Sequence, residues 1–87
     1  MNTAESIKNT IAGYVQANTF HDGKEIKNQT LLFKEGIFDS MAFVLLIDFI
    51  EEKFGIKPGD EDLIEENFES INAISTFIER KQGLIKQ

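Results

Sequence analysis

The chain contains no cysteine, a single proline and a single histidine among its 87 residues. Without cysteine, disulfide bonds and metal sites built on thiolates are excluded. One proline and six glycines are too few for a linker or a disordered tail, so the composition indicates a folded domain. The lone His21 stands in a polar turn with nothing to orient it as a base, and we interpret it as a solvated loop residue.

Positive charge is also scarce. Nine Lys and Arg residues stand against fifteen Asp and Glu residues, which gives a formal net charge of −6. Such a chain repels phosphate backbones and anionic membrane surfaces, so we expect no nucleic-acid partner. A basic protein partner is favoured, because opposite fields speed encounter. Acidity that serves only solubility would give the same composition.

Long apolar stretches are missing as well. The longest unbroken apolar run, Met41 to Ile47, is far shorter than the ~20 residues that span a bilayer. The N-terminal residues lack the basic-then-apolar order of a signal peptide. We therefore expect a soluble, cytoplasmic, monomeric protein with no membrane insertion. The length predicts a single domain over residues 1–87 with its core at about 3–82, and Met1 with short flanks favours a free-standing protein.

Apolar residues at helical spacing predict an all-α fold: a small bundle of three main helices plus one short helix. A long loop from Asn18 to Asp39 separates the first two helices, and its apolar triplet Leu31 to Phe33 should anchor it over the bundle. The predicted helices span about Thr3 to Ala17, Ser40 to Phe54, Asp60 to about Glu66, and Ser70 to Gly83.

Short polar residues and glycines mark the ends of these helices. Asn2 or Thr3 is suited to cap the first helix, and Asp39 and Ser70 are suited to cap the second and last. Gly55 follows the second helix, where a left-handed residue commonly ends a helix.

The second predicted helix is apolar on more than one face. The face suited to the core consists of Ala42, Phe43, Leu46, Ile47, Ile50 and Phe54. The opposite side carries three further apolar residues, Met41, Val44 and Leu45, which we call the apolar patch. Either the long loop covers this patch, or it is exposed for a partner. In the second case its rim is acidic, formed by Asp48, Glu51 and Glu52.

No catalytic constellation is visible in the sequence. Ser40 lacks the flanking glycines of a nucleophile elbow, and the acidic stretch 60–66 lacks the ligand spacing of a calcium loop. We expect no enzyme activity and no stably bound metal. Two functions stay open on these grounds: a helical protein-interaction module that uses the apolar patch without a prosthetic group and, less favoured, a small enzyme that uses Ser40.

The order of three motifs resembles the acyl carrier protein family, over about Thr3 to Arg80. GIFDSM (36–41) opens an apolar helix that ends in EEKFGI (51–56), and ENFESI (66–71) opens the last helix. The resemblance implies that Ser40 carries 4′-phosphopantetheine, taken from coenzyme A, and holds acyl or aminoacyl groups on its thiol as thioesters. It also implies that Asp39 positions magnesium during attachment.

The implied partners are a phosphopantetheinyl transferase, an acyl- or aminoacyl-loading ligase, and downstream synthase or transferase enzymes. These partners would contact the apolar patch and its acidic rim.

Two departures from the family pattern bear on the cargo. Fatty-acid carriers place acidic residues two and five positions after the serine, where this chain has Ala42 and Leu45. The chain therefore looks more like a free-standing, specialised or peptidyl carrier than a housekeeping one, serving a lipid, polyketide or peptide pathway. Positions that are small in carriers of long chains hold Phe43, Phe49 and Ile74 here. We therefore expect short, amino or externally exposed cargo.

Overall fold

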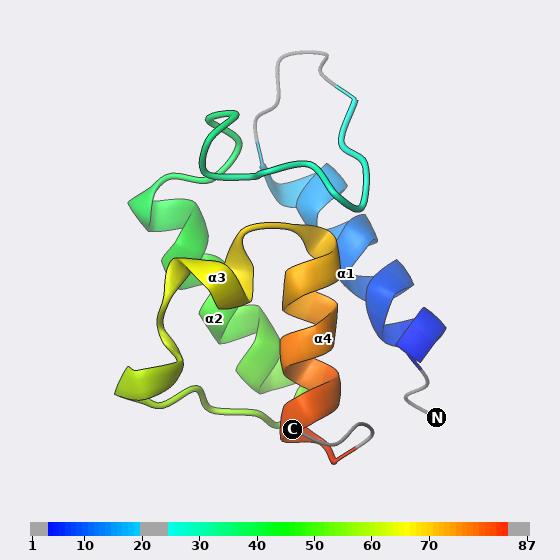
Figure 1. Cartoon of the computed structure of the whole chain (residues 1–87), viewed down its shortest axis with the longest axis vertical. Coiled ribbons are helices and arrows are strands. Elements are labelled where there is room, and N and C mark those ends of the chain that lie inside the picture. Colours follow the sequence, from blue (N-terminus) through cyan, green and yellow to red (C-terminus); the bar gives the residue numbers. More distant parts are fainter. Residues whose placement is uncertain (1–3, 20–24, 84–87) are drawn as a thin grey trace.

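The computed structural model describes residues 4–19 and 25–83, and all regular structure in these ranges is helical (Figure 1). This confirms the predicted all-α bundle of three main helices and one short helix. The predicted caps Asn2 and Thr3 and the turn at His21 lie outside the described residues. The elements are α1 (Ala4–Asn18), α2 (Ser40–Phe54), the 3-10 turn η1 (Asp60–Asp62), α3 (Glu65–Phe68) and α4 (Ile71–Lys81).

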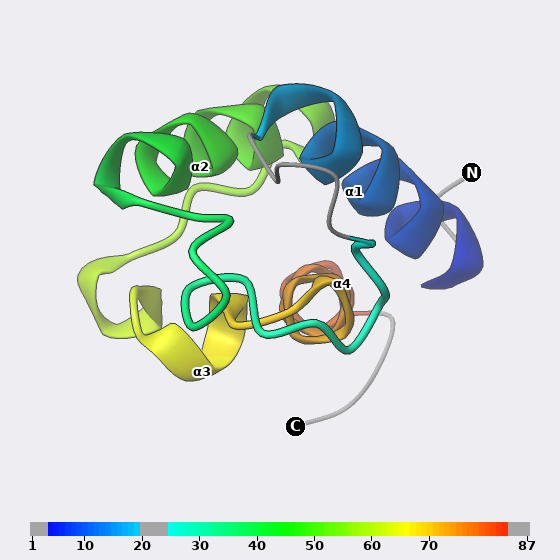
Figure 2. The ribbon, with the colours of Figure 1, turned by 90° about the horizontal axis from the view of Figure 1, so that it is seen from above.

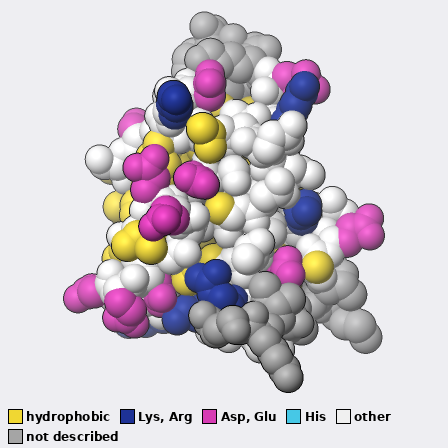
Figure 3. Space-filling view, viewed as in Figure 1, with side chains coloured by type: hydrophobic (Ala, Val, Ile, Leu, Met, Phe, Trp, Pro, Cys, Tyr) yellow, Lys and Arg dark blue, Asp and Glu magenta, His cyan; other side chains and the backbone are white. Residues whose placement is uncertain are grey.

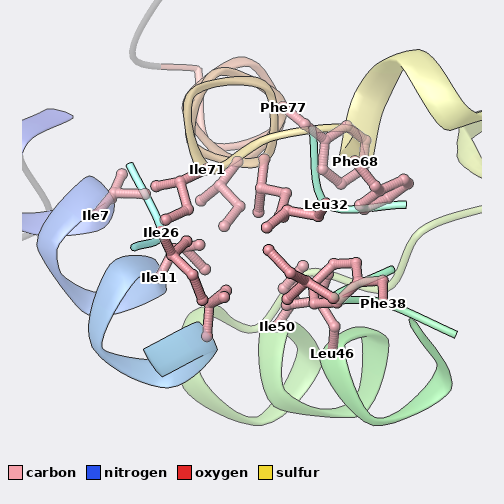
Figure 4. Close-up of a cluster of buried hydrophobic side chains, with 14 of the residues drawn as sticks. Ile7, Ile11, Ile26, Leu32, Phe38, Leu46, Ile50, Phe68, Ile71 and Phe77 are labelled. Atoms are coloured by element: carbon pink, nitrogen blue, oxygen red, sulfur yellow. The ribbon is translucent and has the colours of Figure 1, made fainter. Parts of the chain in front are cut away.

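The helices enclose one apolar core. Figure 2 shows α1 and α2 along one side of the molecule and α3 and α4 on the other, with α4 seen almost end-on. Side chains from both sides meet between these layers (Figure 4), and the stripes expected for α1 and α4 point inward. The fully buried apolar residues of the helices are Ile7, Ile11, Val15, Leu46, Ile50, Phe68, Ile71, Ile74, Phe77 and Ile78.

The long loop before α2 packs against the second half of the chain, as its apolar triplet predicted, although Leu31 of that triplet is 40% exposed. Leu32 is fully buried, and its N–H donates to the carbonyl of Glu69 at 2.8 Å. Farther back in the loop, the carbonyl of Asn28 accepts a hydrogen bond from the N–H of Asn72 at 2.9 Å. These two bonds fix the loop to the start of α4, and they set the direction in which the chain enters α2.

The third helix differs from its prediction. A continuous helix from Asp60 to about Glu66 is wrong, because Leu63 and Ile64 have non-helical backbone angles that separate η1 from α3. The side-chain amide of Asn67 donates to the carbonyl of Asp62 at 2.7 Å, which satisfies a group that a continuing helix would have used. Leu63 and Ile64 are therefore exposed, at 42% and 46%.

An ion pair joins η1 to the end of α4. The Asp62 carboxylate lies 2.9 Å from Lys81 Nζ and accepts the backbone N–H of Gly59 at 3.0 Å. Two hydrogen bonds hold the pKa of Asp62 below its usual value. The bond from Lys81 has the larger effect, and the bond from the Gly59 N–H has the next largest. A carboxyl group with a lowered pKa in the folded state stabilises the fold only while it is ionised.

Asp62→Asn is therefore expected to lower the free energy of unfolding at neutral pH. The deficit should persist above the unfolded pKa of about 4 and vanish as the pH falls through the lower folded pKa. Urea unfolding of both proteins between neutral and strongly acidic pH measures this. Glu61→Gln removes a carboxylate from the same turn, and it should not reproduce the pH-dependent loss. A deficit of equal size at all pH values would contradict the role of the ion pair.

The charged side chains are unevenly distributed over the face that carries α3 and α4. Figure 3 shows Asp and Glu side chains gathered over η1 and α3, with Lys and Arg near the end of α4. Within residues 4–19 and 25–83, no helix is long and apolar enough to cross a membrane.

Candidate functional site

The segment that leads into α2, residues 36–38, is held in place by backbone hydrogen bonds and by the buried side chains of Ile37 and Phe38. Gly36 has a φ of 76°, which favours glycine, and its N–H donates to the carbonyl of Phe33 at 3.1 Å. The N–H groups of Ile37 and Phe38 both donate to the carbonyl of Leu32, and both side chains are only 4% exposed. This fixed turn places the next two residues at the surface.

Asp39 caps α2 as the sequence predicted. Its backbone is extended, and its carboxylate accepts the N–H of Ala42 at 2.8 Å. The first bond inside the helix runs from the N–H of Phe43 to the carbonyl of Asp39 at 2.9 Å. The amides of Ser40 and Met41 belong to the first turn and have no acceptor within the helix. Ser40 is exposed, so its hydroxyl lies where free amides and the helix dipole favour an anion.

Loss of the Asp39 cap should weaken α2. Asp39→Ala is expected to lower the free energy of unfolding by about 1 kcal/mol. Asp39→Asn should keep most of the stability of the unmutated protein, because Asn and Asp both cap helices well. Chemical denaturation measures the difference. Asp48→Ala, an exposed change on the same helix, is the control and should have a smaller effect. Equal stability of Asp39→Ala and the unmodified protein would contradict the capping role.

The apolar patch on α2 is exposed. Met41, Val44 and Leu45 are 66%, 54% and 48% exposed, so the described part of the long loop does not cover them. The acidic side chains expected at the rim, Asp48, Glu51 and Glu52, are exposed as well. Burial, with a smaller contribution from the charge of Asp48, raises the pKa of Tyr14 of α1.

A groove of about 310 Å³ lies directly beside Ser40. It runs between the end of α1, the turn before α2 and the first two turns of α2. No pattern in the sequence indicated it, because it depends on how the end of α1 lies against the start of α2. The lining residues are Asn18, Thr19, Gly36, Ile37, Asp39, Met41, Ala42 and Leu45.

Aromatic rings fill the interior between α2, α3 and α4. Phe43 contacts Phe33 and Phe68 with ring centres 5.7 and 5.2 Å apart, and Phe68 contacts Phe77 at 5.1 Å. Ile74 is fully buried. Phe49 differs from expectation, since it stacks on Tyr14 of α1 at 4.2 Å. It lies about 120° around α2 from Phe43 and fills a different region.

Comparisons with known proteins identify the family. The chain belongs to the family described as the phosphopantetheine attachment site, which matches residues 6–78. Among solved structures, the fold is shared with a chain of the Bradyrhizobium japonicum glycine:carrier protein ligase complexed with glycylated carrier protein. The TM-score is 0.64 at 21% identity, over 87% of this chain and 99% of that chain. No curated protein gives a significant match.

The family membership confirms the resemblance found in the three motifs. The protein is a carrier, and its prosthetic group is covalently attached 4′-phosphopantetheine. It is not an enzyme, because a carrier holds a substrate for other proteins to act on.

Proposed function

We propose that Ser40 is the attachment residue and that the chain presents acyl or aminoacyl thioesters to partner enzymes. The observation that supports this most is the exposed position of Ser40 at the first turn of α2, where the amides of Ser40 and Met41 lack helical acceptors. A phosphodiester at this position would meet free N–H groups and the positive end of the helix dipole. The residues present therefore fit the group.

Attachment exchanges the phosphoanhydride bond of coenzyme A for a phosphodiester bond to Ser40. The Ser40 oxygen forms a bond to the phosphorus of the pantetheine phosphate, the bond to the adenosine bisphosphate part of coenzyme A breaks, and the hydroxyl proton passes to a base of the transferase. We propose that the exposed Asp39 carboxylate helps to position magnesium in this complex, while one of its oxygens caps α2. The group then supplies a thiol that holds a carboxylic acid as a thioester.

The proposed partners are a phosphopantetheinyl transferase, a loading ligase, and downstream synthase or transferase enzymes. The apolar patch begins one residue after Ser40, and such a patch with an acidic rim suits partners with an apolar centre and basic surroundings. We propose that Met41, Val44 and Leu45 form the centre, with Asp48, Glu51 and Glu52 at the rim. A single-domain monomer that acts in the cytoplasm stays a prediction of the sequence.

The filled interior supports short, amino or externally exposed cargo, which would suit a specialised lipid, polyketide or peptide pathway. Phe43 is packed between Phe33 and Phe68, so a long hydrocarbon chain could enter only by displacing rings. The structural neighbour is a glycylated carrier protein, and an aminoacyl cargo here would be compatible with that likeness. A structure of the acylated protein with a long chain inside the bundle would contradict this part of the proposal.

The decisive experiment is incubation with coenzyme A and a broad-specificity phosphopantetheinyl transferase, followed by intact mass spectrometry. We expect the mass to rise by one phosphopantetheine, and fragmentation to place it on the peptide that contains Ser40. A folded protein that gains no mass would overturn the carrier function. That result would favour an interaction module that uses the apolar patch alone.

A further inference from the structure

The groove beside Ser40 has no role in the proposed function so far. Its lining includes the residues on both sides of Ser40, namely Asp39 and Met41. We infer that this groove is the resting site of the pantetheine part of the arm, which lies along α2 against the end of α1. The inference rests on the proposed attachment at Ser40 and adds a binding site to it.

The chemistry of the groove matches that of the arm. Its α2 side is apolar, with Met41, Ala42 and Leu45, which suits the two geminal methyl groups and the methylenes of pantetheine. Its α1 side is polar. The Asn18 amide donates to the Tyr14 carbonyl at 3.0 Å and the Thr19 hydroxyl donates to the Val15 carbonyl at 2.5 Å. Both side chains keep an oxygen that accepts, and pantetheine brings two amide N–H donors.

The size of the groove also suits a slender arm. Its volume of about 310 Å³ lies at the small end of the range for small-molecule sites. From Asp39 to Leu45, α2 rises by ~9 Å, so the groove would hold part of an extended arm and leave the thiol beyond it. Because the arm is tethered, weak contacts suffice, since the local concentration of a tethered group is of millimolar order.

A larger hollow nearby is less suited to the arm. It has a volume of about 550 Å³ and shares Ile37 with the groove. Its lining is mostly polar, and only Leu31 and Ile37 are apolar, so it offers the methyl and methylene groups of the arm less apolar surface. Neither Asp39 nor Met41 lines it. The groove is therefore the site that we assign to the arm.

Solution NMR of the modified protein tests this assignment. With a labelled chain and an unlabelled arm, isotope-filtered NOEs should connect the geminal methyl protons of the arm to the methyl groups of Ala42 and Leu45. Attachment should also shift the amide signals of Asn18 and Thr19, which lie far from Ser40 in sequence. Leu45→Glu should remove these shifts. Val44→Glu, an exposed neighbour that does not line the groove, should retain them.

The outcomes separate the inference from the function on which it rests. Mass spectrometry of the same samples shows whether the arm is attached. An attached arm that gives no NOE to Ala42 or Leu45 and no shift at Asn18 and Thr19 overturns the resting site, while the carrier function stands. A chain that cannot be modified overturns the carrier function itself. The NOEs in the unmutated chain decide the question even if Leu45→Glu is modified poorly.

Discussion

Ser40→Ala is expected to abolish phosphopantetheine attachment completely. The substitution removes the only hydroxyl group between Gly36 and Phe43, and the phosphodiester forms at a hydroxyl oxygen. The fold should survive, because Asp39 caps through its own carboxylate and alanine is the best helix former. Intact mass spectrometry after incubation with coenzyme A and the transferase measures attachment, and thermal unfolding measures the fold.

A matched control separates the loss of a particular hydroxyl from the loss of any hydroxyl. Thr76 is exposed on α4, so Thr76→Ala removes a surface hydroxyl at a distance from the start of α2. This variant should be modified to the same extent as the unmutated chain. If Ser40→Ala still gained the mass of one phosphopantetheine, the attachment residue would lie elsewhere, and the role assigned to the first turn of α2 would be wrong.

Helix α2 was predictable to the residue because its ends are determined locally. A carboxylate at Asp39 and a glycine at Gly55 act on the backbone within a few residues, and the structure shows both, with Gly55 at a φ of 70°. The proposed attachment motif could be recognised for the same reason, since Asp39 and Ser40 are adjacent in sequence. The helical period placed Met41 opposite the core face, but it left open whether the long loop covers that face, and the structure shows Met41 exposed.

The features that sequence reasoning missed depend on contacts between distant or competing groups. At the break between η1 and α3, the Asp62 carbonyl accepts hydrogen bonds from the Ile64 N–H and the Asn67 side chain, and helical periodicity indicates neither bond. The stacking of Phe49 on Tyr14 depends on how α1 lies against α2, and so does the groove beside Ser40. Helical periodicity gives the face of a residue, but it does not give the neighbouring helix that covers the face.

Phe68→Ala should be the most destabilising substitution that we propose. Phe68 is fully buried, and α3 has only four residues, so its own hydrogen bonds cannot hold it. Truncation of a buried phenylalanine costs about 3–5 kcal/mol. A domain of this size has a total stability of roughly 4–13 kcal/mol, so the loss is a large share of the whole. Urea unfolding followed by circular dichroism measures it.

The control for Phe68→Ala is Phe54→Ala, which removes the same ring from a half-buried position at the end of α2. Its cost should be clearly smaller, because less apolar surface returns to water. Equal costs would contradict the central position of Phe68. The substitution Phe68→Ala also bears on the cargo, because the ring that it removes contacts Phe43 and Phe77, and its loss leaves space beneath α2. If filled rings exclude long chains, a longer acyl thioester should stabilise folded Phe68→Ala but not the unmutated carrier.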